Sequence, residues 1–262
     1  MTGTHAMWSG FGKSVNTYFV QLEQAVGADR AVRMAERLGL TWHTDVDQMM
    51  ASPARAAGWG AFTLGVADTT PLEMANAYAT LGGDGMYCQP WPVLSITMPD
   101  GTPATYADQN GQPRQADQPN CHREVSEDVA RAATDAARCV TGFGAAKGPC
   151  GDWSTAPQVK GMVGRPVAGK TGTTDDTRAA WFVGYTPDLA AASFVADPDN
   201  PFNAVGDGNY WKPINAVSFT LRDGLAGSPV RAFTPPSAAI VGTLPRALSP
   251  SRPATPPSRG RR

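Results

Sequence analysis

A lysine-bearing segment followed by two apolar runs constrains the fold more than any other feature of the sequence. The segment Val167–Thr174 places Lys170 directly after a glycine and continues mainly in threonines. The apolar runs span Ala179–Tyr185 and Leu189–Ala196, with Asp, Thr and Pro residues in the turns before them. Short apolar runs bounded by turn residues are typical of consecutive antiparallel strands. We therefore expect a β-meander with Lys170 on its first strand, among hydroxyl groups that suit a substrate carrying a carboxylate.

The same lysine lies in a match to the phosphate-loop pattern G-x-x-x-x-G-K-[ST], over Gly164–Thr171. Ser193–Asp197 resembles the apolar strand ending in Asp that binds magnesium in P-loop NTPases. A phosphate loop needs a helix beginning at the Lys-Thr pair, because the amides of a helix N-terminus bind the phosphate. Gly172–Thr177 consists of poor helix formers, and the next strand follows too soon for a crossover helix. A P-loop NTPase is therefore a disfavoured alternative.

Composition and charge exclude several classes of protein. The 262 residues carry a net charge of −1, which gives no field that attracts nucleic acid or an anionic membrane. No run approaches the roughly 18 apolar residues of a membrane span. Met1–Gly12 lacks the basic and apolar regions of a signal peptide. We expect no nucleic-acid partner and neither a membrane segment nor a signal peptide in this chain.

The cysteines and histidines do not form a metal-binding pattern. The three histidines are scattered, and none of the four cysteines (Cys88, Cys121, Cys139 and Cys150) lies in a C-x-x-C pair. We therefore expect no metal and no cofactor. Disulfides are possible if the chain is exported, and Cys139–Cys150 is the easiest loop to close; free buried thiols are the alternative.

Helical periodicity and capping residues predict helices on both sides of the meander. The expected helices are Asn16–Val26, Asp29–Leu38, one beginning at Thr70-Pro71-Leu72-Glu73, one from Ser126 to about Val140, and one opening at Pro213. The Thr70 segment combines an N-cap threonine, proline and glutamate in a capping box. Trp91–Met98 is predicted to be a strand and Thr102–Asn120 a surface excursion. Residues 1–237 form the expected domain, and residues 238–262 end in a Pro-, Ser- and Arg-rich tail that we expect to be disordered.

Two polar clusters together resemble a known family. Ser14-Val15-Asn16 and Lys170-Thr171-Gly172-Thr173 are similar to the second and third motifs of the penicillin-binding protein transpeptidase domain, whose set is S-x-x-K, S-D-N and K-T-G. Similar segments elsewhere are Ser14–Phe19, Phe62–Gly65, Pro71–Ala79, Gly169–Thr174 and Trp181–Tyr185. The resemblance covers about Ser9–Ser237 and is to the class A (bifunctional) synthases of actinobacteria. A helix N-cap is the alternative role for Ser14 or Asn16.

The resemblance implies a fold and a set of roles. The implied fold is the α+β fold of penicillin-binding transpeptidases and serine β-lactamases, an antiparallel sheet with helices on both faces plus a helical subdomain. Ser14 would relay a proton, and Asn16 would hydrogen-bond the substrate amide. Lys170 would supply positive potential to the substrate carboxylate, which the hydroxyls of Thr171 and Thr173 would bind across Gly172. The Thr173 backbone N–H would form half of the oxyanion hole.

The sequence departs from the family at the first motif. No Ser-x-x-Lys occurs in the chain, and only 13 residues precede Ser14. Ser9 and Lys13 are four residues apart, but Gly10 and Gly12 argue against a helix there. We therefore expect the chain to be a downstream portion of a longer enzyme, without the acylating serine and inactive alone.

The functional expectation is a peptidoglycan D,D-transpeptidase that acts in the cell envelope, with the D-Ala-D-Ala stem peptide and β-lactams as its ligands. A non-catalytic remnant of such a protein is the alternative that the absent serine favours. A β-lactamase or D,D-carboxypeptidase shares the motifs, but the similarity over Pro71–Ala79 favours the synthases.

Overall fold

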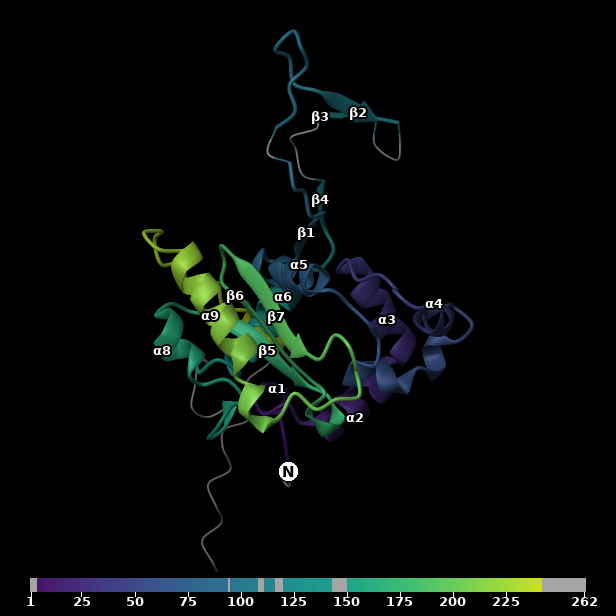
Figure 1. Ribbon diagram of the computed structural model, residues 1–262, viewed down its shortest axis with the longest axis vertical. Helices are drawn as coiled ribbons and strands as arrows, with labels where there is room; N and C mark the ends of the chain where they lie inside the picture. Colours follow the sequence, from purple (N-terminus) through teal and green to yellow (C-terminus); the bar gives the residue numbers. More distant parts are fainter. Residues whose placement is uncertain (1–3, 94, 108–110, 116–119, 143–149, 242–262) are drawn as a thin grey trace, which may run out of the picture.

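The computed structural model describes residues 4–93, 95–107, 111–115, 120–142 and 150–241. Its central element is an antiparallel sheet of β5 (Ala168–Thr173), β6 (Ala179–Tyr185) and β7 (Ala190–Ala196), in the order β5-β6-β7 (Figure 1). The predicted meander with Lys170 on its first strand is confirmed. The chain continues as a strand through the Lys-Thr pair, so the helix that a phosphate loop requires does not form there.

Helices cover both faces of the sheet. Thr171 is opposite Phe182 and Ala168 is opposite Tyr185, and successive residues of a strand face opposite sides. On the Phe182 face, α8 (Val159–Val163) and α9 (Lys212–Gly224) complete a core with Ile214, Val217 and Leu221. On the Tyr185 face lie α5 (Pro71–Gly82) and α6 (Glu127–Arg138), with Tyr78, Leu81 and Ala137 in contact. The predicted arrangement of an antiparallel sheet between helices is confirmed.

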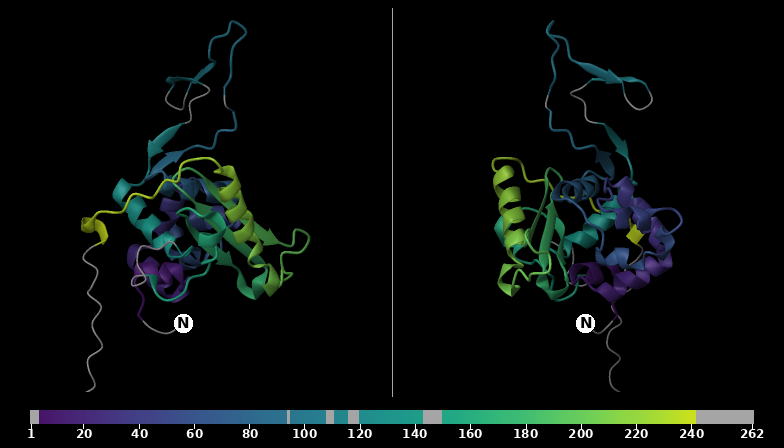
Figure 2. Two further views of the ribbon diagram at one scale, coloured as in Figure 1. Left: turned by 90° about the vertical axis from the view of Figure 1, so that its left-hand side faces the viewer. Right: turned by 45° about the vertical axis from the view of Figure 1, so that its right-hand side comes forward.

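A separate helical region lies beside this sheet (Figure 2). It comprises α2 (Asn16–Val26), α3 (Ala28–Arg37), α4 (Asp45–Ala51), η1 (Ala56–Gly58) and η2 (Gly60–Leu64). Its own core is formed by Val32, Ala56 and Trp59, against which Trp42 and Phe62 pack. This cluster is the predicted helical subdomain, and α2 carries one side of the candidate site.

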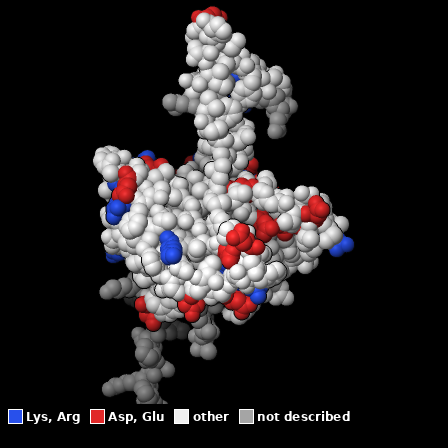
Figure 3. Space-filling model, viewed as in Figure 1, with Lys and Arg blue, Asp and Glu red and all other residues white. Residues whose placement is uncertain are grey.

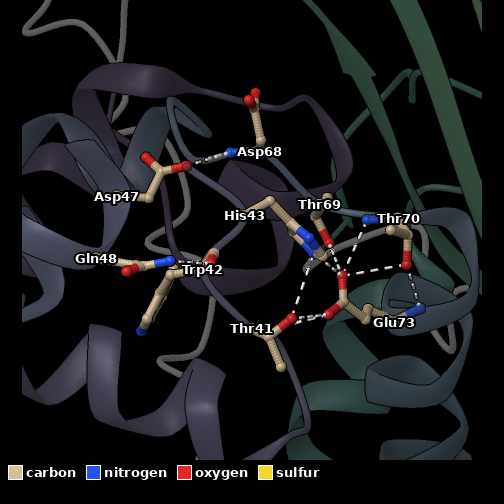
Figure 4. Close-up of polar contacts among 9 residues, drawn as sticks. All are labelled: Thr41, Trp42, His43, Asp47, Gln48, Asp68, Thr69, Thr70 and Glu73. Carbon is tan, nitrogen blue, oxygen red and sulfur yellow. Dashed lines mark hydrogen bonds and ion pairs between the residues drawn. The ribbon is translucent and has the colours of Figure 1, made fainter. Parts of the chain in front are cut away.

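The N-terminus of α5 is held by the capping box that the sequence predicts. The Thr70 hydroxyl accepts a hydrogen bond from the Glu73 backbone N–H at 3.2 Å, and the Glu73 carboxylate accepts one from the Thr70 N–H at 3.0 Å. The same carboxylate accepts the N–H and the hydroxyl of Thr41 and lies 2.7 Å from His43 Nε2 (Figure 4). Through these hydrogen bonds, Glu73 connects the segment after α3 to the N-terminus of α5.

An arm projects from the body between α5 and α6 (Figure 2). Its base pairs β1 (Met86–Cys88) with β4 (Cys121–Arg123), and a Cys88–Cys121 disulfide joins these strands. Farther out, β2 (Thr105–Ala107) pairs with β3 (Pro113–Gln115). On the face that Figure 3 shows, the described part of the arm has few charged side chains. The predicted strand Trp91–Met98 is wrong for the described residues, which form only the bridge Thr97–Pro103. Prolines at positions 90, 92 and 99 lack the N–H that ladder pairing needs.

The remaining elements are short. They are α1 (Met7–Gly12), η3 (Asp175–Thr177), η4 (Asp207–Asn209) and α10 (Ala238–Val241). Residues 242–262 of the predicted tail lie outside the described residues, so the domain boundary at 237 stays a prediction.

In the part of the chain that is described, no helix is long and apolar enough to cross a membrane. The described residues likewise contain no group of three or more His, Cys, Asp or Glu side chains placed to hold a metal ion.

Candidate active site

The segment that carries Ser14 begins with a helix that the sequence argued against. Gly10 and Gly12 lie inside α1, so the expectation that they prevent a helix is wrong. A Cβ at Gly10 would come within 3.0 Å of the Tyr18 ring, and one at Gly12 within 2.9 Å of the Cys139 Cβ. Glycine is needed here for close packing against α2 and the end of α6, and this packing outweighs its low helix propensity.

Ser14 follows α1 in a strained backbone conformation and makes a long-range contact. Its φ is 54°, in the left-handed region that non-glycine residues rarely adopt. The N-cap of α2 is Val15, without a side-chain capping bond, so the N-cap reading of Ser14 and Asn16 is wrong. The Ser14 Oγ instead accepts a hydrogen bond from Lys170 Nζ at 2.7 Å. The structure thus brings together two motifs that are 156 positions apart.

Lys170 is partly buried. Its ammonium also donates to the Thr171 carbonyl oxygen at 2.7 Å and lies 5.8 Å from the centroid of the Phe11 ring. Burial lowers the pKa of Lys170 from 10.5 to about 8, because a low-dielectric environment disfavours the charged form. At neutral pH the side chain is mostly protonated and can attract a carboxylate. It can also release a proton under mildly basic conditions, as a group in acid–base chemistry must.

The edge of β5 presents backbone N–H groups beside this lysine. Among the described residues β5 pairs only with β6. The Thr174 N–H donates to the Ala179 carbonyl at 3.0 Å, and hydrogen-bonded pairs alternate along an antiparallel ladder. The N–H groups of Thr173 and Thr171 therefore point away from β6, outward from the free edge of the sheet. These N–H groups are therefore not used by the β5–β6 ladder.

The other predicted residues lie around this contact with differing exposure. Gly172 and Thr173 continue β5, and Thr173 is exposed. Asn16 is exposed in the first turn of α2, and among the hydrogen bonds of the described residues none joins its side chain to Ser14 or Lys170. The predicted roles of Asn16, Gly172 and Thr173 stay predictions.

Ser9 and Lys13 do not pair with each other. The Ser9 hydroxyl donates to the Ala6 carbonyl at 3.2 Å, and Lys13 Nζ forms an ion pair with Asp152 at 2.6 Å. A substitute for the Ser-x-x-Lys motif is therefore absent from this part of the described chain.

Sequence reasoning missed Phe11, whose ring lies near the Lys170 ammonium, and Thr155. The Thr171 hydroxyl donates to the Thr155 hydroxyl at 2.8 Å. Thr155 lies in a loop rich in glycine and proline, without a periodic pattern. The nearest signal in the sequence is the Cys139–Cys150 pair, which the sequence leaves open as the easiest disulfide to close and which the structure contains.

The profile of the penicillin binding protein transpeptidase domain matches residues 2–213. The chain belongs to this family. Among curated relatives, it is 30% identical over 224 residues to penicillin-binding protein 2D of Bacillus subtilis, covering 85% of this chain and 28% of that protein. It is also 30% identical over 247 residues to the peptidoglycan D,D-transpeptidase PbpA of Mycolicibacterium smegmatis, covering 84% of this chain and 45% of the relative. The chain thus spans less than half the length of these relatives.

Solved structures of the family share the fold. The PonA1 protein of Mycobacterium tuberculosis in complex with penicillin V superposes with a TM-score of 0.66 at 23% identity, over 90% of this chain and 61% of that one. Penicillin-binding protein 1A of Haemophilus influenzae gives a TM-score of 0.68 at 23% identity, over 90% of this chain and 36% of the other. The predicted penicillin-binding transpeptidase fold is confirmed.

Proposed function

We propose that this chain provides the lysine side of a transpeptidase cleft that binds the D-alanyl-D-alanine end of a peptidoglycan stem peptide. β-Lactams would compete for the same place, and the setting would be the cell envelope. The observation that carries the proposal is the 2.7 Å contact between Lys170 Nζ and Ser14 Oγ. It joins an ammonium on β5 and a hydroxyl from the segment before α2.

The chemistry of these groups suits acyl transfer. Lys170 and the Thr171 and Thr173 hydroxyls would hold the substrate carboxylate, because charge-assisted hydrogen bonds are stronger than neutral ones. The Thr173 N–H would stabilise the oxyanion of the tetrahedral intermediate. Ser14, in contact with a lysine of lowered pKa, would carry a proton toward the leaving amine while Asn16 orients the substrate amide.

The nucleophile is the part that these residues do not provide. No Ser-x-x-Lys occurs in the 262 residues, and Lys13 is paired with Asp152 rather than with Ser9. We therefore propose that this chain binds its ligands without covalent turnover when it is alone. A β-lactamase or carboxypeptidase activity would need the same missing nucleophile.

An NMR titration with N-acetyl-D-alanyl-D-alanine tests the binding proposal. Saturable shifts are expected at the amides of Ser14, Thr171 and Thr173. The C-terminal amide of the same dipeptide, which lacks the carboxylate, is the matched ligand control. Hydrogen bonds to charged groups contribute about 1.5–3 kcal/mol, so the control should bind roughly 10- to 100-fold more weakly. Equal affinity for both ligands, or no saturable shift with the acid, would show the proposal to be wrong.

A further inference from the structure

Thr155 connects the two halves of the candidate site. Its backbone N–H donates to the Gly12 carbonyl at 3.1 Å, two positions before Ser14. Its hydroxyl lies 2.8 Å from the Thr171 hydroxyl on β5. One residue therefore contacts both the Ser14 segment and the strand that carries Lys170, from a third segment of the chain.

The loop that carries Thr155 is fixed at several other points. The Cys139–Cys150 disulfide attaches it to the end of α6, and the Ala156 N–H donates to the Val140 carbonyl at 3.0 Å. Asp152 forms the ion pair with Lys13 at 2.6 Å, next to Ser14, and Cys139 is 2% exposed beneath Gly12. Residues 143–149 lie outside the described part of the chain, but the disulfide places Cys150 independently of them.

We propose that Thr155 is a positioning residue that orients the Thr171 hydroxyl for a ligand carboxylate, and that the Cys139–Cys150 disulfide holds Thr155 in place. The ligand class in this statement rests on the proposed function. The placement of the Thr171 side chain does not depend on it. The carboxylate affinity of the site thus depends on a residue and a disulfide outside the two sequence motifs.

The chemistry follows from the properties of paired hydroxyl groups. A hydroxyl has one donor and two acceptor lone pairs, and its hydrogen rotates to suit its partners. In the structure Thr171 donates to Thr155. When a carboxylate binds, the pair can reverse, so that Thr155 donates to Thr171 and Thr171 donates to the carboxylate. Such a chain strengthens the terminal hydrogen bond, because each bond polarises the next.

Two substitutions at Thr155 separate this role from a merely structural one. Thr155→Val keeps the shape and the backbone N–H but removes the hydroxyl, whereas Thr155→Ser keeps the hydroxyl. The loss of one neutral hydrogen bond should weaken N-acetyl-D-alanyl-D-alanine binding by about 2- to 10-fold in Thr155→Val. Thr155→Ser should restore the affinity of the unmodified chain.

A second pair of variants tests the disulfide. The double substitution Cys139→Ser, Cys150→Ser should remove the protection of the Thr155 amide against hydrogen exchange. It should also weaken the binding of the dipeptide at least as much as Thr155→Val does. The matched control is Cys88→Ser, Cys121→Ser, which removes the disulfide at the base of the arm. This control should leave both measurements unchanged.

A ligand-free measurement keeps the inference separate from the proposed function. Scalar couplings should show one χ1 rotamer for Thr171 in the unmodified chain and in Thr155→Ser, and rotamer averaging in Thr155→Val. If the dipeptide does not bind at all, the proposed function is wrong. The couplings still show whether Thr155 orients the Thr171 side chain. The inference is overturned if Thr155→Val retains the Thr171 rotamer, if Thr155→Ser behaves as Thr155→Val does, or if both disulfide variants have the same effect.

Discussion

Glu73→Gln should lower the stability of the fold, and the loss should depend on pH. The Glu73 side chain is 15% exposed and accepts hydrogen bonds from Thr41, His43 and Thr70. Burial alone would raise its pKa, but the hydrogen bonds from Thr41, His43 and Thr70 outweigh burial and lower the pKa from 4.5 to about 2. Glutamine keeps the shape and removes the charge that these donors stabilise.

The expected magnitude follows from the two pKa values. A fall from 4.5 to about 2 corresponds to ~3 kcal/mol at ~1.36 kcal/mol per pH unit. The His43 side chain is 37% exposed, so water screens part of this interaction, and we expect a loss of ~1–2 kcal/mol at neutral pH. A carboxyl whose folded-state pKa is depressed contributes fully above its unfolded value. The difference between the two proteins should therefore shrink as pH falls from 4.5 to about 2.

Urea unfolding followed by tryptophan fluorescence, repeated across this pH range, measures the effect. Asp68→Asn is the matched control, because the Asp68 side chain points away from the Glu73 cluster (Figure 4). If Glu73→Gln is as stable as this control at neutral pH, or if its deficit is the same at both ends of the range, the Glu73 cluster does not hold α5 in the way described.

Four further predictions follow from the site. Affinity for N-acetyl-D-alanyl-D-alanine should fall as pH rises through about 8, the lowered pKa of Lys170, because deprotonation removes the ammonium. The Lys170→Met variant should bind the dipeptide weakly, with an affinity that does not change through this pH. A pH-independent affinity in the unmodified chain would refute the role of Lys170 in carboxylate binding. Fluorescent penicillin should give no covalent label, and an adduct on Ser9 or Ser14 in peptide mass mapping would contradict this. Calorimetry with Mg·ATP should show no binding; micromolar affinity abolished by Lys170→Ala would revive the phosphate-loop reading. Since φ of Ser14 is 54°, Ser14→Gly should be more stable to urea than Ser14→Ala by ~1–2 kcal/mol, and equal stabilities would show that the backbone is unstrained.

Local signals in the sequence were sufficient for the sheet and for several helices. The meander follows from strand and turn residues that are adjacent in the chain, and α5 follows from a capping box within four positions. The contact between Ser14 and Lys170 could be expected only through the family resemblance, since nothing in spacing or periodicity places residues 156 apart beside each other. The catalytic roles of these residues stay predictions.

Tertiary contacts explain what the sequence did not predict. Glu73 was expected only as a cap for Thr70, whereas its bonds to Thr41 and His43 depend on the packing of the helical subdomain against α5. Thr155 could not be assigned because its position depends on a disulfide and on the Gly12 carbonyl. In each case the missing information is a partner distant in sequence, which local propensity does not encode.

The strained Ser14 backbone shows how packing places the Ser14 hydroxyl beside Lys170. The Val15 N–H donates to the Gly10 carbonyl and the Ser14 N–H to the Phe11 carbonyl, so the chain turns sharply between α1 and α2. Gly12, two residues before Ser14, packs directly on Cys139, and Ser14 itself lies in the left-handed region. A strained residue of this kind costs on the order of 1–3 kcal/mol and persists only where its surroundings over-determine it. Here the surroundings include the close glycine packing of α1 and the hydrogen bond from Lys170, so a strained residue is the one through which the two motifs meet.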